Sequence, residues 1–185
     1  MPHVPRRLLA GVLAALAACS TAQVAAAAPA PPPVPVPPDI AVEAGHKPFL
    51  VGHAVGVQRY FCTSAPGGGW AWSAATPEAK LYDDRGAVIA DHFGGPSWRA
   101  KDGSTVTASR VNGVTPDPTA IPWLLLERDG EATSGPGRLD PTTFIQRVAT
   151  TGGRPPSVSA CEDGGHTVHR EIPYTADYVF WKERA

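Results

Sequence analysis

The 185-residue sequence lacks several features that mark well-known functional classes. It has no basic stripe, and its 16 basic and 17 acidic residues give a formal net charge of −1, so no nucleic-acid partner is expected. No G-x-G-x-x-G motif follows a strand-like segment, and no cofactor is predicted. Beyond residue 38, no stretch of ten or more residues shows clean 3.6-residue periodicity, so long amphipathic helices are not expected.

Cysteine is also scarce, with only Cys19, Cys62 and Cys161 in the chain. If Cys19 belongs to an export leader, the other two are the only remaining pair. Two leftover cysteines in an oxidising compartment usually form a disulfide. Closing a loop of about 100 residues would stabilise the fold by roughly 4–5 kcal/mol in the chain-entropy model. A reactive thiol is the alternative, although no adjacent motif favours it.

The first 18 residues have the order of a secretory signal. Arg6 and Arg7 precede an apolar run of 11 residues, 8–18, which is too short to span a bilayer comfortably as a helix. The "LAAC" at 16–19 resembles the lipobox of bacterial lipoproteins, in which the cysteine is lipidated and becomes the mature N-terminus. We therefore expect a signal peptide over 1–18 and a membrane anchor on Cys19, with simple cleavage slightly later as the alternative. Either route takes the protein out of the cytoplasm.

An alanine- and proline-rich segment, residues 19–38, follows the leader. Seven prolines lie between Pro29 and Pro38. Because proline lacks an N–H and fixes φ, this segment is predicted to be an extended, semi-rigid spacer rather than part of a sheet or helix. The remaining residues, 39–185, are enough for one domain with a core of its own.

Residues 39–185 are predicted to form an all-β domain. "FLVGHAVGVQRYFCTS" alternates and is rich in β-branched and aromatic residues, with Gly56 marking a turn or bulge between strands at 49–55 and 57–63. "DDRG" predicts a hairpin turn, and "WLLLERD" a central strand. Only "TPEAK", with Thr76 as the cap, suggests a short helix. Nine or ten closely spaced strands predict an antiparallel β-sandwich or a partly open β-barrel.

A series of motifs occurs in a fixed order along this domain: "GVQRYFC", "WAW…TPEAKLYDDRG", "HFGGPSWRAKDGS", "AIPWLLLE", "FIQRVATTGGRPP", the cysteine at 161 and "YTADYVFW". Together they resemble a secreted family of bacteria and fungi known only as a domain of unknown function, DUF3455. The resemblance covers about residues 40–182. It implies an extracytoplasmic domain with paired cysteines, and it implies no activity. Arg59 stands where the family more often has Ile, which predicts a charge at the surface.

Catalytic constellations are weak. Ser97, His92 and Asp91 or Asp102 could form a triad, but "GGPSW" is not the G-x-S-x-G nucleophile elbow. A hydrolase acting on envelope or extracellular polysaccharide is the alternative function, with a pair of carboxylates such as Glu78 and Asp102 as acid and base. Glycosidase chemistry depends on the separation of such a pair, which the sequence does not give. The other isolated acidic candidates are Glu127 and Asp177.

A metal site is not predicted. His166 and His169 have H-x-x-H spacing, and Glu162 and Asp163 precede them. On a strand, residues three apart point to opposite faces, so this spacing brings ligands together only where the chain bends. The simpler interpretation is a pair of exposed histidines near a loop.

A small-ligand site is the leading functional hypothesis. On a regular strand Gln58 shares a face with Tyr60 and Cys62, and Gln146 shares one with Phe144 and Val148. A buried amide without a partner costs on the order of 1–3 kcal/mol, so each glutamine either binds backbone groups or faces a polar ligand.

The segment "DHFGGPSWRAKDGS", residues 91–104, completes this hypothesis. It is predicted to make two turns, with Trp98 packing the corner between them and Asp102 bonded to its own backbone. His92 is the one residue without an evident structural task. His92, Trp98, Gln58 and Gln146, with Trp70 as an exposed aromatic, are therefore predicted to bind a small polar ligand or an envelope component.

Overall fold

The computed structural model describes residues 1, 35–130, 137–162 and 165–184. The predicted signal peptide, the lipidation site at Cys19 and most of the proline-rich spacer lie outside these residues. Within them, no helix combines the length and apolarity needed to cross a membrane.

The described residues form nine strands with very little helix, which confirms the all-β prediction. The strands are β1 (His46–Ser64), β2 (Trp70–Trp72), β3 (Thr76–Tyr82), β4 (Val88–Phe93), β5 (Ser97–Ala100), β6 (Thr105–Val114), β7 (Trp123–Arg128), β8 (Phe144–Gly152) and β9 (His169–Glu183). The helical pieces are the 3-10 turns η1 (Pro38–Ile40) and η2 (Gly165–Thr167) and the short helix α1 (Ser159–Glu162).

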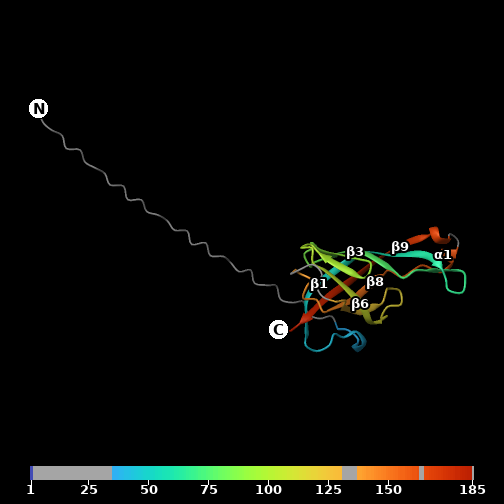
Figure 1. Cartoon of the computed structure of the whole chain (residues 1–185), viewed down its shortest axis with the longest axis horizontal. Helices are drawn as coiled ribbons and strands as arrows, with labels where there is room; N and C mark the ends of the chain where they lie inside the picture. Colours follow the sequence, from blue (N-terminus) through green and yellow to red (C-terminus); the bar gives the residue numbers. More distant parts are fainter. Residues whose placement is uncertain (2–34, 131–136, 163–164, 185) are drawn as a thin grey trace.

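All strand pairs are antiparallel, and they form one sheet in the order β2-β1-β3-β4-β5-β6-β7-β8-β9. β1 also pairs with β9, from His46 opposite Glu183 to Phe61 opposite His169. The hydrogen bonding therefore returns to its starting strand and encloses an interior (Figure 1). The ring is irregular, because β2 extends only the end of β1 and several strand pairs contain register shifts. The structure is thus one curled sheet rather than two stacked ones.

β1 is a single long strand, so the predicted interruption at Gly56 is wrong. Gly56 pairs with Ala79 on β3 and with Tyr174 on β9. A Cβ atom at this position would lie 2.2 Å from the carbonyl oxygen of Glu78 and 2.5 Å from the Cα of Ala79. The glycine therefore allows two backbones to approach closely, which is the other common reason for glycine inside a strand.

The predicted helix at "TPEAK" is also wrong, because Thr76 is the first residue of β3. β3 alternates exposed and buried positions, with Ala79 and Leu81 facing the interior. Pairing with β1 on one side and β4 on the other satisfies its backbone groups, and this tertiary context outweighs a weak local helix signal.

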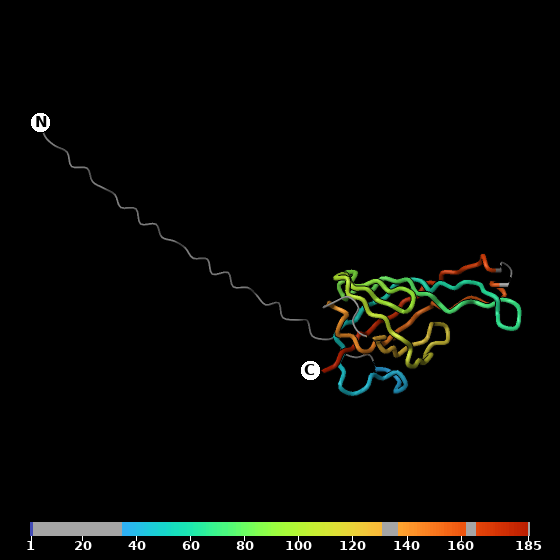
Figure 2. The backbone as a smooth tube through the Cα atoms, in the orientation of Figure 1, coloured from blue at the N-terminus to red at the C-terminus, as the bar shows by residue number. Residues whose placement is uncertain are grey.

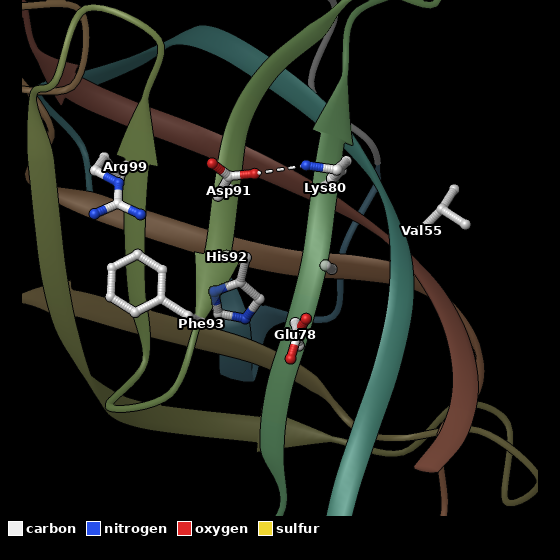
Figure 3. Close-up of a pocket in the computed structure, with 8 residues that line it drawn as sticks. Val55, Glu78, Lys80, Asp91, His92, Phe93 and Arg99 are labelled. Carbon is white, nitrogen blue, oxygen red and sulfur yellow. Dashed lines mark hydrogen bonds and ion pairs between the residues drawn. The ribbon is translucent and has the colours of Figure 1, made fainter.

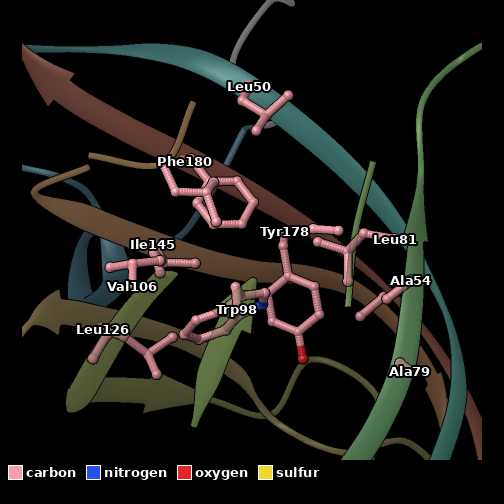
Figure 4. Close-up of a cluster of buried hydrophobic side chains, with 14 of the residues drawn as sticks. Leu50, Ala54, Ala79, Leu81, Trp98, Val106, Leu126, Ile145, Tyr178 and Phe180 are labelled. Carbon is pink, nitrogen blue, oxygen red and sulfur yellow. The ribbon is translucent and has the colours of Figure 1, made fainter. Parts of the chain in front are cut away.

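The interior of the ring is packed with apolar and aromatic side chains. Trp98, Tyr178, Phe180 and Leu81 are all at most 1% exposed and come from β5, β9 and β3 (Figure 4). Trp98 contacts Tyr178 and Phe180 edge-on, at ring-centroid distances of 5.4 and 6.1 Å. This arrangement confirms that Trp98 packs the corner made by residues 91–104.

A second apolar cluster lies on the outer face of β7, β8 and β9. Figure 2 shows the segment that leads into β1, drawn in blue, turning back on itself before the strand begins. In this segment, η1 places Ile40 on the outer face, fully buried with Leu125, Val148 and Val179. The segment thus covers apolar side chains that the ring itself directs outward.

A disulfide joins Cys62, near the end of β1, to Cys161 in α1, as the cysteine pairing predicted. The two Cα atoms are 5.4 Å apart and 99 residues apart in sequence. Trp72 on β2 donates a hydrogen bond to the carbonyl of Ser157 at 3.2 Å, which further fixes this end of the molecule. A disulfide of this kind is characteristic of an oxidising, extracytoplasmic compartment.

Candidate ligand-binding cavity

Residues 91–104 make the two turns that the sequence predicts. β4 ends at Phe93, Gly94–Pro96 reverse the chain, and β5 begins at Ser97. The second turn precedes β6, and there the Asp102 carboxylate accepts hydrogen bonds from the backbone N–H and the hydroxyl of Ser104, at 3.0 and 2.6 Å. Gly95 and Gly103 have φ values of 99° and 89°, a region that glycine adopts at little cost. The turns hold His92 and Trp98 opposite each other on β4 and β5.

His92 is buried in the interior, with 2% of its surface exposed. Its ring stacks on Trp98 at a centroid distance of 4.4 Å and an angle of 6°, and it meets Tyr178 edge-on at 4.8 Å. Burial lowers the pKa of His92 to about 3, against a hydrogen bond to the Ser97 carbonyl that raises it, and the charge of Arg147 lowers it further. The ring is therefore neutral at physiological pH.

The hydrogen bond to Ser97 also fixes the tautomer of His92. Nδ1 lies 2.9 Å from the Ser97 carbonyl oxygen, which can only accept. Nδ1 must therefore carry the proton, and Nε2 is left as an acceptor. A structural task thus exists for His92, although the sequence suggested none.

A cavity of about 410 Å³ opens beside this stack. Its size lies within the range of pockets that hold small molecules, about 300–1,000 Å³. Three of the five predicted ligand-binding residues, Gln58, His92 and Trp98, line it together. The full lining also includes Ala74, Ala75, Pro77, Gly95, Pro96, Arg110, Leu124, Leu126, Arg147 and Tyr178.

Two buried hydrogen-bond donors of the lining have no partner among the described residues. Gln58 is only 1% exposed, and its Nε2 makes no hydrogen bond there; the indole Nε1 of Trp98 makes none either. Each unpaired buried donor costs about 1–3 kcal/mol. Buried polar groups without a hydrogen-bond partner are uncommon in folded proteins, so each of them needs a structural or functional explanation.

Sequence reasoning missed the two arginines and the tyrosine of the cavity. Arg147 follows Gln146 on β8, so it faces the opposite side, where its Nε donates to the Pro122 carbonyl at 3.0 Å. Burial raises the pKa of Tyr178, and the nearby charge of Arg147 lowers it. Arg110 on β6 lines the cavity from an exposed position. The alternation of "FIQRVAT" could have predicted the position of Arg147. Successive side chains on a strand point to opposite faces, so the residue after Gln146 must face the other side.

The structure places Gln146 away from the cavity. As predicted, it shares a face with Phe144 and Val148, but this is the outer face beneath η1. Its Nε2 donates to the Ile40 carbonyl at 2.7 Å, and its Oε1 accepts from the indole of Trp181 at 2.9 Å. Both ends of the amide are therefore occupied, and the two glutamines do not face one ligand.

Trp70 also lies elsewhere, on β2 beside the disulfide. It is partly buried, and its ring meets His166 edge-on at 4.6 Å. His169 stands at the start of β9, where its ring lies 6.1 Å from that of Phe61. Within the described part of the chain, no group of three or more potential ligands is arranged to hold a metal ion.

The carboxylates proposed for hydrolysis have separate tasks outside this cavity. Glu78 pairs with Arg59 at 2.7 Å on the surface, and Arg59 also pairs with Glu171 at 2.8 Å, which confirms the predicted surface charge at Arg59. Asp102 is occupied by Ser104 and by the backbone N–H of Arg138 at 2.7 Å. Neither carboxylate lines the cavity.

The proposed triad is not assembled either. The His92 ring bonds the backbone oxygen of Ser97, whereas the Ser97 hydroxyl lies 3.1 Å from the Thr107 hydroxyl. Asp91, one residue from His92, turns to the outer face and pairs with Lys80 at 3.2 Å. No proton relay connects the three groups.

A second depression lies on the outer face of β3, β4 and β5 (Figure 3). Lys80 and Asp91 face each other across the strands, and the Arg99 guanidinium lies 5.3 Å from the centroid of the Phe93 ring. These charged groups already have partners, and none of the polar side chains described there is both buried and unpartnered. The interior cavity is therefore the stronger candidate site.

Comparison with known proteins identifies a family. No curated protein and no solved structure matches the chain. A family model described as "Protein of unknown function (DUF3455)" matches residues 43–182, which extend from just before β1 almost to the end of β9 and include both cysteines of the disulfide and all the residues that line the cavity. The chain therefore belongs to the DUF3455 family.

Proposed function

We propose that this protein is an extracytoplasmic binding module that takes up a small polar ligand in the cavity lined by Gln58, His92 and Trp98. The observation that carries the proposal is the pair of unpartnered donors, Gln58 Nε2 and Trp98 Nε1, in residues that line a cavity of about 410 Å³. A ligand with hydrogen-bond acceptors would satisfy them.

The stacked rings support binding rather than catalysis. His92 is neutral and is held by Ser97 and Trp98, so it offers an acceptor at Nε2 without a proton to give at neutral pH. Trp98 and Tyr178 hold it rigidly, and rigid walls lower the entropy cost of binding. Among the residues that the structure describes, no carboxylate lines the cavity to act as a general base.

The membrane anchor on Cys19 is part of the proposal. It rests on the "LAAC" motif at 16–19 and on the proline-rich spacer that follows. Such a tether would hold the domain in the cell envelope. Cys19→Ala should release the protein into the medium, and unchanged membrane association after fractionation would contradict the anchor without affecting the cavity.

The test of binding is a thermal-shift panel on the purified protein. The probes are glucose, benzyl alcohol, benzoate, hexanoate and inorganic phosphate, which vary in charge and in apolar content. A probe at 100 times its Kd should stabilise the fold by about 2.7 kcal/mol, which for a domain of this size raises Tm by roughly 5–10 °C.

A plugged variant shows whether the stabilisation comes from this cavity. Ala75→Trp introduces a large side chain at an exposed position of the lining and should abolish the shift. Ala87→Trp, at an exposed position of the β3–β4 turn outside the lining, should leave it unchanged. If no probe stabilises the protein, or if the plugged variant responds as the parent does, the proposal is wrong.

A further inference from the structure

The described charges that line the cavity are of one sign. Two lining residues, Arg110 and Arg147, are cationic, and no aspartate or glutamate within 35–130, 137–162 and 165–184 lines the cavity. His92 contributes no charge, because its burial keeps the ring neutral. Among the described residues, no carboxylate forms an ion pair with either arginine within 4.0 Å.

In the described part of the chain, the hydrogen-bond partner of Arg147 is a neutral carbonyl group. The Nε of Arg147 donates to the Pro122 carbonyl at 3.0 Å. Burial raises the pKa of the Tyr178 hydroxyl, and the nearby charge of Arg147 lowers it. A half-buried cation is stabilised most strongly by an anion that also accepts hydrogen bonds, and guanidinium groups match the two oxygens of a carboxylate or phosphate. The Pro122 carbonyl occupies Nε of Arg147, so the terminal N–H groups of this guanidinium can serve such an anion.

Donors outnumber acceptors at the site. Gln58 Nε2 and Trp98 Nε1 are donors without partners, and both arginines offer only donors. The acceptors are fewer: Nε2 of the neutral His92 ring and Oε1 of Gln58. A ligand that satisfies this set must bring more acceptors than donors, which describes an oxyanion better than a sugar, whose hydroxyl groups offer both.

The remaining lining is apolar. Leu124 and Leu126 of β7 face the cavity, with Pro77 at the start of β3 and Pro96 in the β4–β5 turn. The stacked rings of His92 and Trp98 add an aromatic wall. A ligand that fills the cavity therefore has an apolar body as well as a charged head.

We infer that the ligand is a small organic acid, with a carboxylate held by Arg147 and Arg110 and an apolar or aromatic body packed against β7 and the His92–Trp98 stack. This inference rests on the proposed function and specifies its ligand class. Arg110, which is exposed, attracts the anion, and Arg147, which is deeper, holds it beside Tyr178.

Benzoate and benzyl alcohol test the inference, because they share a ring and differ in charge. Isothermal titration calorimetry on the purified protein should show that benzoate binds at least about tenfold more tightly than benzyl alcohol, the effect of one charge-assisted hydrogen-bonded pair. Arg110→Gln and Arg147→Gln should each weaken benzoate about tenfold and leave benzyl alcohol unchanged. Glutamine at 147 keeps a donor for the Pro122 carbonyl, and thermal unfolding shows that each variant is folded.

The control is Arg99→Gln, which removes an exposed arginine on the same sheet that faces the outer depression and does not line the cavity. It should bind benzoate as the parent does. Equal weakening in all three variants would show a general effect of net charge and would overturn the inference.

The other outcomes separate the two proposals. If benzyl alcohol or glucose binds at the plugged site as well as benzoate does, the anion inference fails while the binding function stands. If inorganic phosphate binds and benzoate does not, the ligand is an inorganic oxyanion. The inference that the ligand carries an apolar body is then wrong. If no probe binds, both proposals fail.

Discussion

His92 shows how burial changes the chemistry of one side chain. Its ring is held between Trp98, Tyr178 and the Ser97 carbonyl, and the folded protein keeps it neutral down to a pKa of about 3. In an unfolded chain the same ring would titrate near 6.5. The difference links the free energy of unfolding to pH, because the unfolded state binds a proton that the native state excludes.

The stability of the protein should therefore fall as the pH is lowered below 6.5. Between this value and the folded pKa of about 3, the contribution of His92 is lost at up to about 1.4 kcal/mol per pH unit. His92→Phe keeps an aromatic ring in the stack but cannot be protonated, so its unfolding free energy should decline less steeply toward acid. Urea unfolding at a series of pH values compares the two slopes, and parallel curves would contradict the expectation.

His53 contributes with the opposite sign, which is why the comparison with a variant is needed. Its two ring nitrogens lie 2.9 and 2.7 Å from carboxylate oxygens of Asp84 and Asp177. Hydrogen bonds to Asp84 and then to Asp177 raise the pKa of His53. Its stabilising effect is present below the unfolded pKa and is lost as the pH rises through the folded pKa. The difference between the parent and His92→Phe cancels this effect.

Two elements, β1 and η1, carry contacts that local sequence does not reveal. β1 lies between β3 and β9, and at Gly56 it approaches β3 closely enough to exclude a Cβ atom. η1 places Ile40 on the outer face of β7, β8 and β9, where Gln146 fixes its carbonyl.

Gly56→Ala should weaken the pairing of β1 with β3. The new methyl group would meet the Glu78 carbonyl at 2.2 Å, and backbone cannot rotate away as a side chain can. We expect a loss of at least about 2 kcal/mol in the free energy of unfolding by urea. Gly94→Ala is the matched control, because its methyl group meets only the Thr76 side chain at 2.8 Å and should cost below about 1 kcal/mol. Similar losses in both variants would contradict a backbone conflict at Gly56.

Ile40→Ala tests whether the η1 segment is part of the folded domain. Ile40 is fully buried, so its truncation should cost about 2–4 kcal/mol, as for other buried aliphatic residues. Val111→Ala, at a position that is 54% exposed, should change stability by less than about 0.5 kcal/mol. Urea unfolding of both variants gives the comparison, and a loss at Ile40 no greater than at Val111 would mean that the segment adds nothing to stability.

At the scale of the whole molecule, the disulfide and the pairing of β1 with β9 close the structure. Both connect distant parts of the chain: Cys62 with Cys161, and residues 46–61 with residues 169–183. The cavity opens among strands that this closure brings together, since Gln58 lies on β1, Arg147 on β8 and Tyr178 on β9.

Removal of the disulfide should lower stability substantially. For a loop of about 100 residues the chain-entropy model gives roughly 4–5 kcal/mol, and the measured loss on removing a native disulfide is typically about 2–5 kcal/mol. Cys62→Ala with Cys161→Ala should show this loss in urea unfolding. A reducing agent should destabilise the parent by a similar amount and have no effect on the double variant. A reductant effect on the variant would point to some other cause.

By itself, the sequence determined the features that depend on local periodicity and on the number of cysteines. Alternating apolar residues specify strands, turn residues specify the double reversal at 91–104, and two leftover cysteines specify one disulfide. The same reasoning placed Gln58, His92 and Trp98 in a candidate site, and the structure brings these three residues together around one cavity.

Only the tertiary structure decided which face of each strand is inside. Periodicity shows that Gln146 and Val148 share a face, but η1 covers that face from outside, so the neighbouring Arg147 faces the cavity instead. The tertiary structure likewise decided that Gly56 allows the backbones of β1 and β3 to approach closely, and that Thr76 begins a strand. Pairing and coverage come from segments far away in the chain, and their free energy outweighs local propensity, which is why a single stretch of sequence could not reveal them.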